Sequence, residues 1–382
     1  MYDLIIVGGG PAGSSAGRTA GRLGLRALLL EKEVFPREKP CGGALSARAL
    51  ASLDFLLPPA LQAQALTGAR VCYRGRKVEA HLSAPYAFLV SRSDFDHFLL
   101  TEAEKAGIEV HQGEKVLGLC ETDGSISVRT PVGVYRGRCA LIAEGAQGHL
   151  KGRARRRETR AEQGFAIVTE IPVTQPQAGI AEIHFGMSRW GYGWIFPHAG
   201  YLSVGVGGLL PAMPRIRERL QVFLRKNGLP ETSRCRGHVI PMGGIRRNLV
   251  NGRILLCGDA AGFADPLSGE GIAYAIRSGQ LAAEAVHRAL SERIEALEEY
   301  EAACERAFGG ELRDALFLAR LVHRFPAAFH RLFSSHPRVV AAYLDVVAGI
   351  RSYRSFLAWA LPRMPAYLAL REICRPTPAK KI

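Results

Sequence analysis

The sequence predicts an α/β protein in which a parallel nucleotide-binding sheet, discontinuous along the chain, receives an inserted and mainly antiparallel domain. Two observations support this fold class. An apolar run at the N-terminus leads into a glycine-rich turn and a helix-like segment, and a second strand-turn-helix pattern recurs near residue 255. The chain has 382 residues, of which 48% are hydrophobic, so it can bury a core in about two lobes.

The first element is the strand-like run DLIIV, which leads into a turn with the spacing G-x-G-x-x-G. Gly8 and Gly10 let the backbone turn and approach a pyrophosphate, and Gly13 lets the following helix pack closely on the strand. The N-terminus of that helix, which begins at Pro11 and Ala12, then faces the phosphates with its unpaired N–H groups, to which Pro11 contributes none. The pattern predicts a Rossmann-like dinucleotide site; the alternative is a strand-turn-helix without a ligand.

A second apolar strand, RALLLE, ends in Glu31, about twenty residues further on. An acid at this position accepts hydrogen bonds from a ribose hydroxyl and therefore favours an unphosphorylated adenosine ribose. The motif and this acid together do not separate NAD from FAD.

The segment GRILLCGDAAGFADPLSGEGIAYAI favours FAD. It predicts a strand, a turn with Gly258 and Asp259, a loop with Gly269, and a helix that begins near Gly271 and Ile272. A carboxylate at the end of a strand can hold a ribityl hydroxyl, and the helix N-terminus can stabilise negative charge on a reduced flavin ring. This segment must return to the first sheet, so the nucleotide domain is discontinuous.

The net charge of +15 attracts anions without saying which. From residue 311 onward, twelve Lys and Arg stand against four acids, interleaved with apolar residues. This pattern fits a helical region on an anionic membrane surface, and a helical lobe with a solvated basic face is the alternative. A nucleic-acid partner is not expected, because no recognition motif for one is present.

The eight cysteines form no C-x-x-C pair, and the eleven histidines form no H-E-x-x-H or other ligand spacing. We therefore expect reduced thiols and no metal site. The chain starts directly on a strand-like run without a secretory signal, which predicts a cytoplasmic location, with peripheral attachment to the inner face of the membrane as an extension of it.

These segments resemble the FAD fold that para-hydroxybenzoate hydroxylase shares with its relatives. The resemblance rests on residues 8–13, on Glu31 and on the Gly-Asp pair that ends in Asp259. The segment SRSDFDHFLL, with Arg92, is similar to the arginine-containing segment after the first lobe of that superfamily, which implies a cofactor role for Arg92. Glu144 stands where the superfamily has an aspartate.

Within that superfamily, the stretch KPCGG (39–43) resembles the geranylgeranyl reductase family. The segment GYGWIFPHAGYLSVGVGG looks like the aromatic Y-x-W-x-F-P…G-x-G signature of the same family, with Tyr192, Trp194, Phe196 and Pro197 in its first half. The matching pieces span residues 1 to about 290 of the chain.

The aromatic residues also have a direct physical interpretation. Trp194 and Phe196 alternate along a predicted strand, so both point to one face, and Tyr192 joins them. With Pro197 they are expected to line a long apolar pocket for a polyprenyl chain. The alternative is an ordinary sheet core.

The cysteine of KPCGG stands on unusually free backbone. Gly42 and Gly43 let the chain pass close to a planar ring, and the resemblance implies that Cys41 and Gly42 lie beside the isoalloxazine. Cys41, Tyr192 and Trp194 are the candidate catalytic residues. Cys41 either shapes the pocket or moves a proton, and the lack of a C-x-x-C partner disfavours a flavin–disulfide relay.

The resemblance implies reduction of isolated C=C bonds in a geranylgeranyl or other polyprenyl chain, by hydride transfer from reduced FAD. Tyr192 or an ordered water is the candidate proton donor. The prenyl carrier is a diphosphate, a lipid, a chlorophyll precursor or a quinone, and the external reductant is NAD(P)H, a ferredoxin or a quinol. The rival functions are an FAD-dependent monooxygenase or halogenase on the same fold, and a membrane-docking flavoprotein.

We thus expect a discontinuous Rossmann-like FAD-binding domain, an inserted substrate domain built mainly from an antiparallel β-sheet, and a C-terminal helical, membrane-associated region. Their expected bounds are 1–70, 90–155 and 250–310 for the first, 71–89 and 156–249 for the second, and 311–382 for the third.

Overall fold

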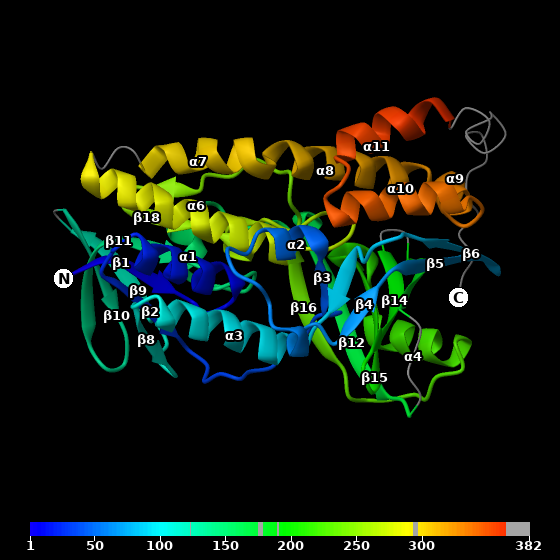
Figure 1. Cartoon of the computed structure of the whole chain (residues 1–382), viewed down its shortest axis with the longest axis horizontal. Helices are drawn as coiled ribbons and strands as arrows, with labels where there is room; N and C mark the ends of the chain where they lie inside the picture. Colours follow the sequence, from blue (N-terminus) through cyan, green and yellow to red (C-terminus); the bar gives the residue numbers. More distant parts are fainter. Residues whose placement is uncertain (123, 175–178, 189–190, 293–296, 364–382) are drawn as a thin grey trace.

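The computed structural model describes the chain except for residues 123, 175–178, 189–190, 293–296 and 364–382. A mainly parallel sheet and a mainly antiparallel sheet lie next to each other along the longest axis, and helices cover both (Figure 1). This arrangement confirms the predicted α/β fold class, including the return of the segment near residue 255 to the first sheet.

The first sheet is built around five parallel strands. Its spatial order is β17 (Val250–Asn251), β18 (Ile254–Leu256), β11 (Val134–Ile142), β1 (Tyr2–Val7), β2 (Ala27–Glu31) and β8 (Glu109–Gln112). In addition, β10 (Ser125–Arg129) pairs with the start of β11, and β9 (Gly118–Thr122) pairs with β10. The strands β18, β11, β1, β2 and β8 run parallel. Leu29 and Leu141 are fully buried, because helices and loops cover both faces of such a sheet.

Small residues let the helices of this lobe approach one another closely. Helix α1 (Pro11–Arg22) packs against both α3 (Arg92–Lys105) and α6 (Ile272–Ser291). A Cβ atom added at Gly279 of α6 would lie 2.1 Å from the carbonyl oxygen of Ala12. Helices α5 (Gly258–Ala261) and α7 (Glu299–Cys304) complete the lobe.

The second sheet has seven strands. Its spatial order is β16 (Arg236–Pro241), β12 (Gln163–Pro172), β15 (Tyr201–Leu209), β14 (Gly191–His198), β13 (Ile180–Ser188), β5 (Gly68–Tyr73) and β6 (Arg76–His81). Every neighbouring pair is antiparallel except β13 and β5. Helix α4 (Ile216–Lys226) packs on one face of the sheet through Phe223.

Helices from the end of the chain cover the opposite face. They are α8 (Gly310–Arg324), α9 (Pro326–Phe333), α10 (Pro337–Ala348) and α11 (Tyr353–Ala360) (Figure 1). A small third sheet connects the lobes. It consists of β3 (Ala44–Ser46), β7 (Ala87–Leu89) and β4 (Gln64–Leu66), and helix α2 (Ala47–Ala51) directly follows β3. None of the helices in the described part of the chain has the length and hydrophobicity needed to cross a bilayer.

Candidate functional site

Four parallel strands end at one edge of the first sheet. The strand register places Val7, Leu30, Ile142 and Leu256 in a single row. The residues that follow these strands therefore gather at the same edge, as expected for the carboxyl ends of parallel strands. We call this region, which contains Gly8, Glu31, Glu144 and Asp259, the cofactor edge.

The glycine-rich turn passes through the cofactor edge too closely for side chains. Gly8 has φ +108°, and a Cβ atom there would lie 2.5 Å from the carbonyl oxygen of Ala143. A Cβ atom at Gly13 would lie only 1.8 Å from the carbonyl oxygen of Gly8. Gly10 precedes α1, whose first residue is Pro11. The free N–H groups at the start of α1 therefore point into the turn, as a bound phosphate requires.

Glu31 is buried at the end of β2 and helps to fix the turn. Its Oε2 accepts a hydrogen bond from the backbone N–H of Gly9 at 2.6 Å, and its Oε1 accepts one from Glu33 at 2.9 Å. Each carboxylate oxygen has two lone pairs, so each can still accept a hydrogen bond from a ribose hydroxyl.

Asp259, which follows β18, forms a polar cluster with His238 and Lys39. The Nε2 atom of His238 lies 3.7 Å from Asp259 Oδ2 and 2.9 Å from Lys39 Nζ. Burial raises the pKa of Asp259, but the nearby His238 and the charges of Lys39 and Arg92 outweigh it, so the pKa falls below its usual value. Burial lowers the pKa of Lys39 to about 8. The cluster offers an anionic acceptor and a donor to hydroxyl or phosphate groups.

Two arginines share one buried carboxylate beside the turn. Arg92 donates two hydrogen bonds of 2.8 Å to Asp96, and Arg37 Nη1 lies 3.1 Å from the same carboxylate. Arg37 Nη1 is buried without a hydrogen bond, and a Cβ atom at Gly10 would lie 3.6 Å from Arg37 Nη2. A surplus positive charge with an unused donor next to a glycine-rich turn fits an anionic group such as a pyrophosphate.

Cys41 stands where the cofactor edge meets the second sheet. Its Sγ accepts a hydrogen bond of 3.4 Å from the N–H of Gly43, which has φ +77°. Burial lowers the pKa of Arg92, but Asp96 and the neighbouring Cys41 outweigh it and raise the pKa well above its usual value. Arg92 therefore lies next to both the Asp96 carboxylate and the Cys41 thiol.

The side chains of Tyr192, Trp194 and Phe196 lie on one face of β14, which we call the aromatic face. The ring centroid of Trp194 lies 6.1 Å from that of Tyr192 and 6.3 Å from that of Phe196. A Cβ atom at Gly42 would lie 2.9 Å from Phe196 and 3.3 Å from Trp194 Nε1. That Nε1 atom is buried and has no hydrogen-bond partner among the residues that the structure describes. The loop around Cys41 thus covers the aromatic face directly.

The strand alternation separates Pro197 from these three side chains. Pro197 shares its face of β14 with Ile195, which packs into the core beneath α4. Tyr192 itself is engaged, since its hydroxyl donates a hydrogen bond to the carbonyl oxygen of Ser268, and burial raises its pKa well above the usual value. Tyr192 therefore ties the aromatic face to the loop before α6.

The loop before α6 is held from several directions. Asp265 Oδ1 accepts hydrogen bonds of 2.8 Å from the N–H groups of Leu267 and Ser268, and Tyr353 of α11 donates to Asp265 Oδ2 at 2.7 Å. Gly269 has φ +78°, and Gly271 and Ile272 open α6. Burial raises the pKa of Glu270 to about 7, and Ser46 of β3 donates a hydrogen bond to it.

The structure therefore gathers the predicted cofactor residues at one edge and places Cys41 and Gly42 between this edge and the aromatic face. Gly258, with φ +56°, lies against Ala12 of α1. Sequence patterns did not indicate a role for a further set of site residues, which are Arg37, Lys39, His238, Glu270 and Tyr353. Lys39 nevertheless stands in KPCGG, and Arg37 lies two positions earlier. Only the last three lack a local signal, because their partners are distant in sequence.

The donor set fits FAD. The glycine-rich turn, the α1 N-terminus and Arg37 would hold the pyrophosphate, Glu31 the adenosine ribose, and Asp259 with Lys39 the ribityl chain. The α6 N-terminus would face the flavin ring, next to Cys41.

Comparisons with known proteins support these assignments of fold and cofactor. A family model described as FAD binding domain matches residues 1–157. A geranylgeranyl diphosphate reductase of Rhodobacter capsulatus is 32% identical over 297 residues, which cover 74% of each chain. A menaquinone reductase of Mycobacterium tuberculosis is 31% identical over 316 residues, which cover 74% of this chain and 76% of that protein.

Solved structures share the fold over most of the chain. A geranylgeranyl bacteriochlorophyll reductase-like protein of Thermoplasma acidophilum superimposes with a TM-score of 0.82 at 22% identity, covering 97% of both chains. A flavin-dependent brominase superimposes with a TM-score of 0.72 at 20% identity, covering 95% of this chain and 98% of the other. The same fold thus serves proteins with different chemistry.

Proposed function

The chain belongs to the geranylgeranyl reductase family of FAD-dependent oxidoreductases, and from this premise we propose that it reduces isolated C=C bonds in a polyprenyl chain. Three kinds of carrier for that chain are supported by the names of the relatives: a diphosphate, a phospholipid and a quinone. The part shared by all three is the prenyl chain, and the proposal concerns this part.

The position of Cys41 and Gly42 carries the proposal. Gly42 lies against Trp194 and Phe196, and Cys41 neighbours Arg92, which pairs with Asp96. An apolar chain on the aromatic face would therefore lie within reach of the flavin end of the cofactor edge. Apart from the Trp194 Nε1–H, the rings of Trp194 and Phe196 offer no hydrogen-bonding group, so each further hydroxyl or charged group buried against them would cost about 2–7 kcal/mol.

An isolated alkene has no carbonyl group to take up negative charge, so its reduction requires a proton as well as a hydride. FAD, when bound and reduced, supplies the hydride. The chain contributes the rest: Trp194 and Phe196 exclude water from the alkene, and the hydrogen bond from Gly43 fixes the thiol of Cys41 beside it. Tyr192 or an ordered water is our candidate proton donor, and the Tyr192 hydroxyl would have to release its hydrogen bond to Ser268 to deliver a proton.

The test is an anaerobic turnover experiment. The flavin of the purified protein is photoreduced, and geranylgeranyl diphosphate, a geranylgeranylated phospholipid or menaquinone is added while flavin absorbance and product mass are recorded together. Reoxidation with a gain of two hydrogens in the prenyl chain supports the proposal. Reoxidation only after oxygen is admitted, with an oxygenated or halogenated product, would instead support a monooxygenase or halogenase.

We propose that the C-terminal helices attach the protein to an anionic membrane surface. Arg313, Phe317, Arg320 and Arg324 follow one another at helical spacing along α8, and all four are exposed. Four of the twelve basic residues counted after position 311 fall in 364–382, outside the described residues. Sedimentation with vesicles that contain anionic or only neutral lipids tests this proposal, because binding should require the anionic lipid.

The external reductant is proposed at the level of a class: NAD(P)H, a ferredoxin or a quinol. The rate of anaerobic flavin reduction by each, measured by stopped-flow absorbance, assigns it.

A further inference from the structure

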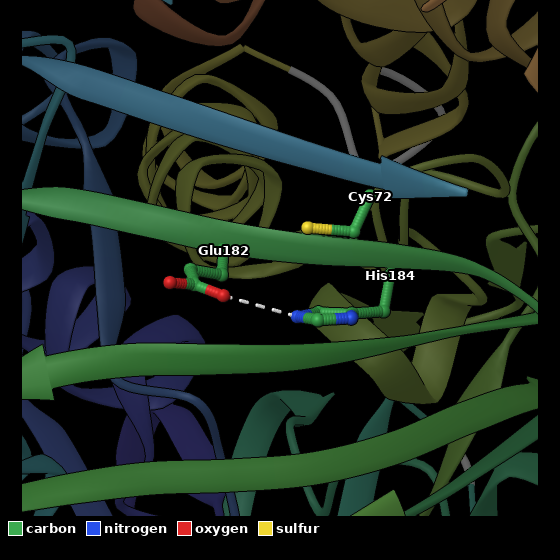
Figure 2. Close-up of side chains that lie close together, drawn as sticks. All are labelled: Cys72, Glu182 and His184. Carbon is green, nitrogen blue, oxygen red and sulfur yellow. Dashed lines mark hydrogen bonds and ion pairs between the residues drawn. The ribbon is translucent and has the colours of Figure 1, made fainter. Parts of the chain in front are cut away.

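Three metal-ligating side chains meet on the second sheet, on the face away from the aromatic residues. Cys72 belongs to β5, and Glu182 and His184 belong to the neighbouring strand β13. The parallel register pairs His184 directly with Cys72, and Glu182 is two residues before His184 on the same face. Figure 2 shows the three side chains pointing to the same side of the two strands.

The three groups are close together and sheltered. Their candidate ligand atoms all lie within 4.8 Å of one another, and His184 Nε2 is 3.1 Å from Glu182 Oε2. Cys72 is buried, and the His184 ring packs edge-on against Phe223 of α4 at a centroid distance of 4.9 Å. Among the residues that the structure describes, these three side chains form a group that offers one sulfur, one nitrogen and one oxygen ligand to a metal ion.

We propose that Cys72 Sγ, an imidazole nitrogen of His184 and a carboxylate oxygen of Glu182 bind one zinc-type divalent cation. Thiolate and imidazole ligands select zinc over magnesium or calcium, which prefer oxygen donors alone. Zinc accepts four ligands at about 2.0–2.3 Å in a tetrahedron, so three protein ligands leave one position for water. The proposal requires the three side chains to rotate so that their ligand atoms, now within 4.8 Å of one another, reach that geometry.

The surroundings of Glu182 leave one of its oxygens for the cation. Arg70 of β5 forms ion pairs with both Glu182 and Glu79, so its charge is shared between two carboxylates. Arg70 binds Oε1 of Glu182, whereas Oε2 faces His184. A hydrogen-bonded second oxygen is the usual support for a carboxylate ligand. Lys77, opposite Cys72 on β6, is exposed and can extend into solvent.

Cation binding makes the thiol of Cys72 release its proton to the solvent, so that the thiolate offsets part of the incoming charge. The site joins β5 to β13, the one parallel pair of this sheet, whose two strands are far apart in sequence. Their separation also explains why no ligand spacing along the sequence indicated the site.

The experiment uses the full-length, flavin-loaded protein without an affinity tag. The protein is stripped with a chelator, dialysed against buffered Zn²⁺, and analysed by mass spectrometry of the metal and by X-ray absorption at the zinc edge. We expect about one zinc ion per chain with one sulfur ligand at about 2.3 Å. Cys72→Ser and His184→Gln should each lower the affinity at least about tenfold, and Arg70→Gln by about tenfold.

The matched control is Cys120→Ser, because Cys120 is exposed on β9 and distant from the cluster. It should bind zinc like the original protein. Flavin absorbance and circular dichroism verify that each variant is folded, and two independent ligand variants keep the test decisive if one does not fold. Absence of bound zinc, or equal stoichiometry and affinity in both ligand variants and the original protein, would overturn the proposal.

Discussion

The cofactor edge is polar and held by backbone hydrogen bonds, whereas the aromatic face is apolar and contains a tryptophan N–H that has no partner in the described part of the chain. At the cofactor edge, Gly8, Gly13 and Glu31 are placed by the strands next to them in sequence. At the aromatic face, the loop at Gly42 lies against Trp194, and Phe196 packs on the helices from the end of the chain. The glycine-rich turn of the first region is therefore specified locally, whereas the second region is formed only by the completed fold.

A clash in the glycine-rich turn should break the cofactor edge without changing the aromatic face. In Gly13→Ala the added Cβ atom would lie 1.8 Å from the carbonyl oxygen of Gly8, so the turn must move and we expect bound FAD to be lost. Flavin absorbance of the purified protein measures this. Gly133→Ala is the control, because nothing lies within 4 Å of its Cβ position, and equal flavin loss in both variants would contradict the argument.

The raised pKa of Glu270 predicts a pH dependence of stability. The folded state keeps the proton up to about pH 7, but the unfolded chain loses it near the ordinary value of 4.5. The folded state thus binds more protons between these values, and stability falls as pH rises from about 4.5 to 7. The loss is at most about 3 kcal/mol. Denaturant unfolding across this range should show a shallower decline in Glu270→Gln.

Glu104→Gln serves as the control for that experiment, because Glu104 is exposed on α3. Its pH profile should follow the original protein. A Glu270→Gln profile with the original slope would assign the decline to other groups.

Removal of the Asp259 charge should weaken the cofactor edge in proportion to its role in the cluster. Asp259→Asn keeps the side-chain shape but leaves Lys39 and His238 without a neighbouring anion. It also replaces a charged hydrogen bond to FAD with a weaker neutral one. We expect the FAD dissociation constant to rise about tenfold to a hundredfold. Fluorescence titration of the flavin-free protein measures it, and an unchanged constant would remove Asp259 from the site.

A change at Cys41 should sharpen the comparison, because it lies between the two regions. We expect Cys41→Ala to retain FAD while alkene reduction falls about tenfold or shifts to different double bonds, since the thiol helps to position the alkene. Anaerobic turnover with product mass analysis measures both. Cys120→Ala provides an exposed-thiol control, and unchanged rate and product distribution in Cys41→Ala would exclude a role at the site.

The smallest effect concerns the contact from α11. Tyr353→Phe removes the 2.7 Å hydrogen bond to Asp265 and leaves the ring in place, which should lower the free energy of unfolding by about 1 kcal/mol. Thermal and denaturant unfolding measure this loss. A variant as stable as the original protein would mean that the hydrogen bond from Tyr353 does not stabilise the loop before α6.

The sequence predicted the close backbone packing of the glycine-rich turn, because that information is local. A strand followed by G-x-G-x-x-G and an acid at the next strand end define backbone geometry within thirty residues or so. Alternation likewise predicted that Tyr192, Trp194 and Phe196 share a face, but the same rule assigns Pro197 to the opposite face. Glu270 and Tyr353 were not found, because burial of Glu270 and the reach of α11 to Asp265 depend on long-range packing.

The bond between Tyr353 and Asp265 has a consequence for how the protein is made. The loop before α6 receives its last support from a helix near the end of the chain, whereas the glycine-rich turn is synthesised first. A ribosome-bound nascent chain therefore lacks a complete site until its final helices have emerged and packed. We therefore expect flavin to be bound at full strength only after α11 has packed, and chains truncated before α11 to bind it more weakly.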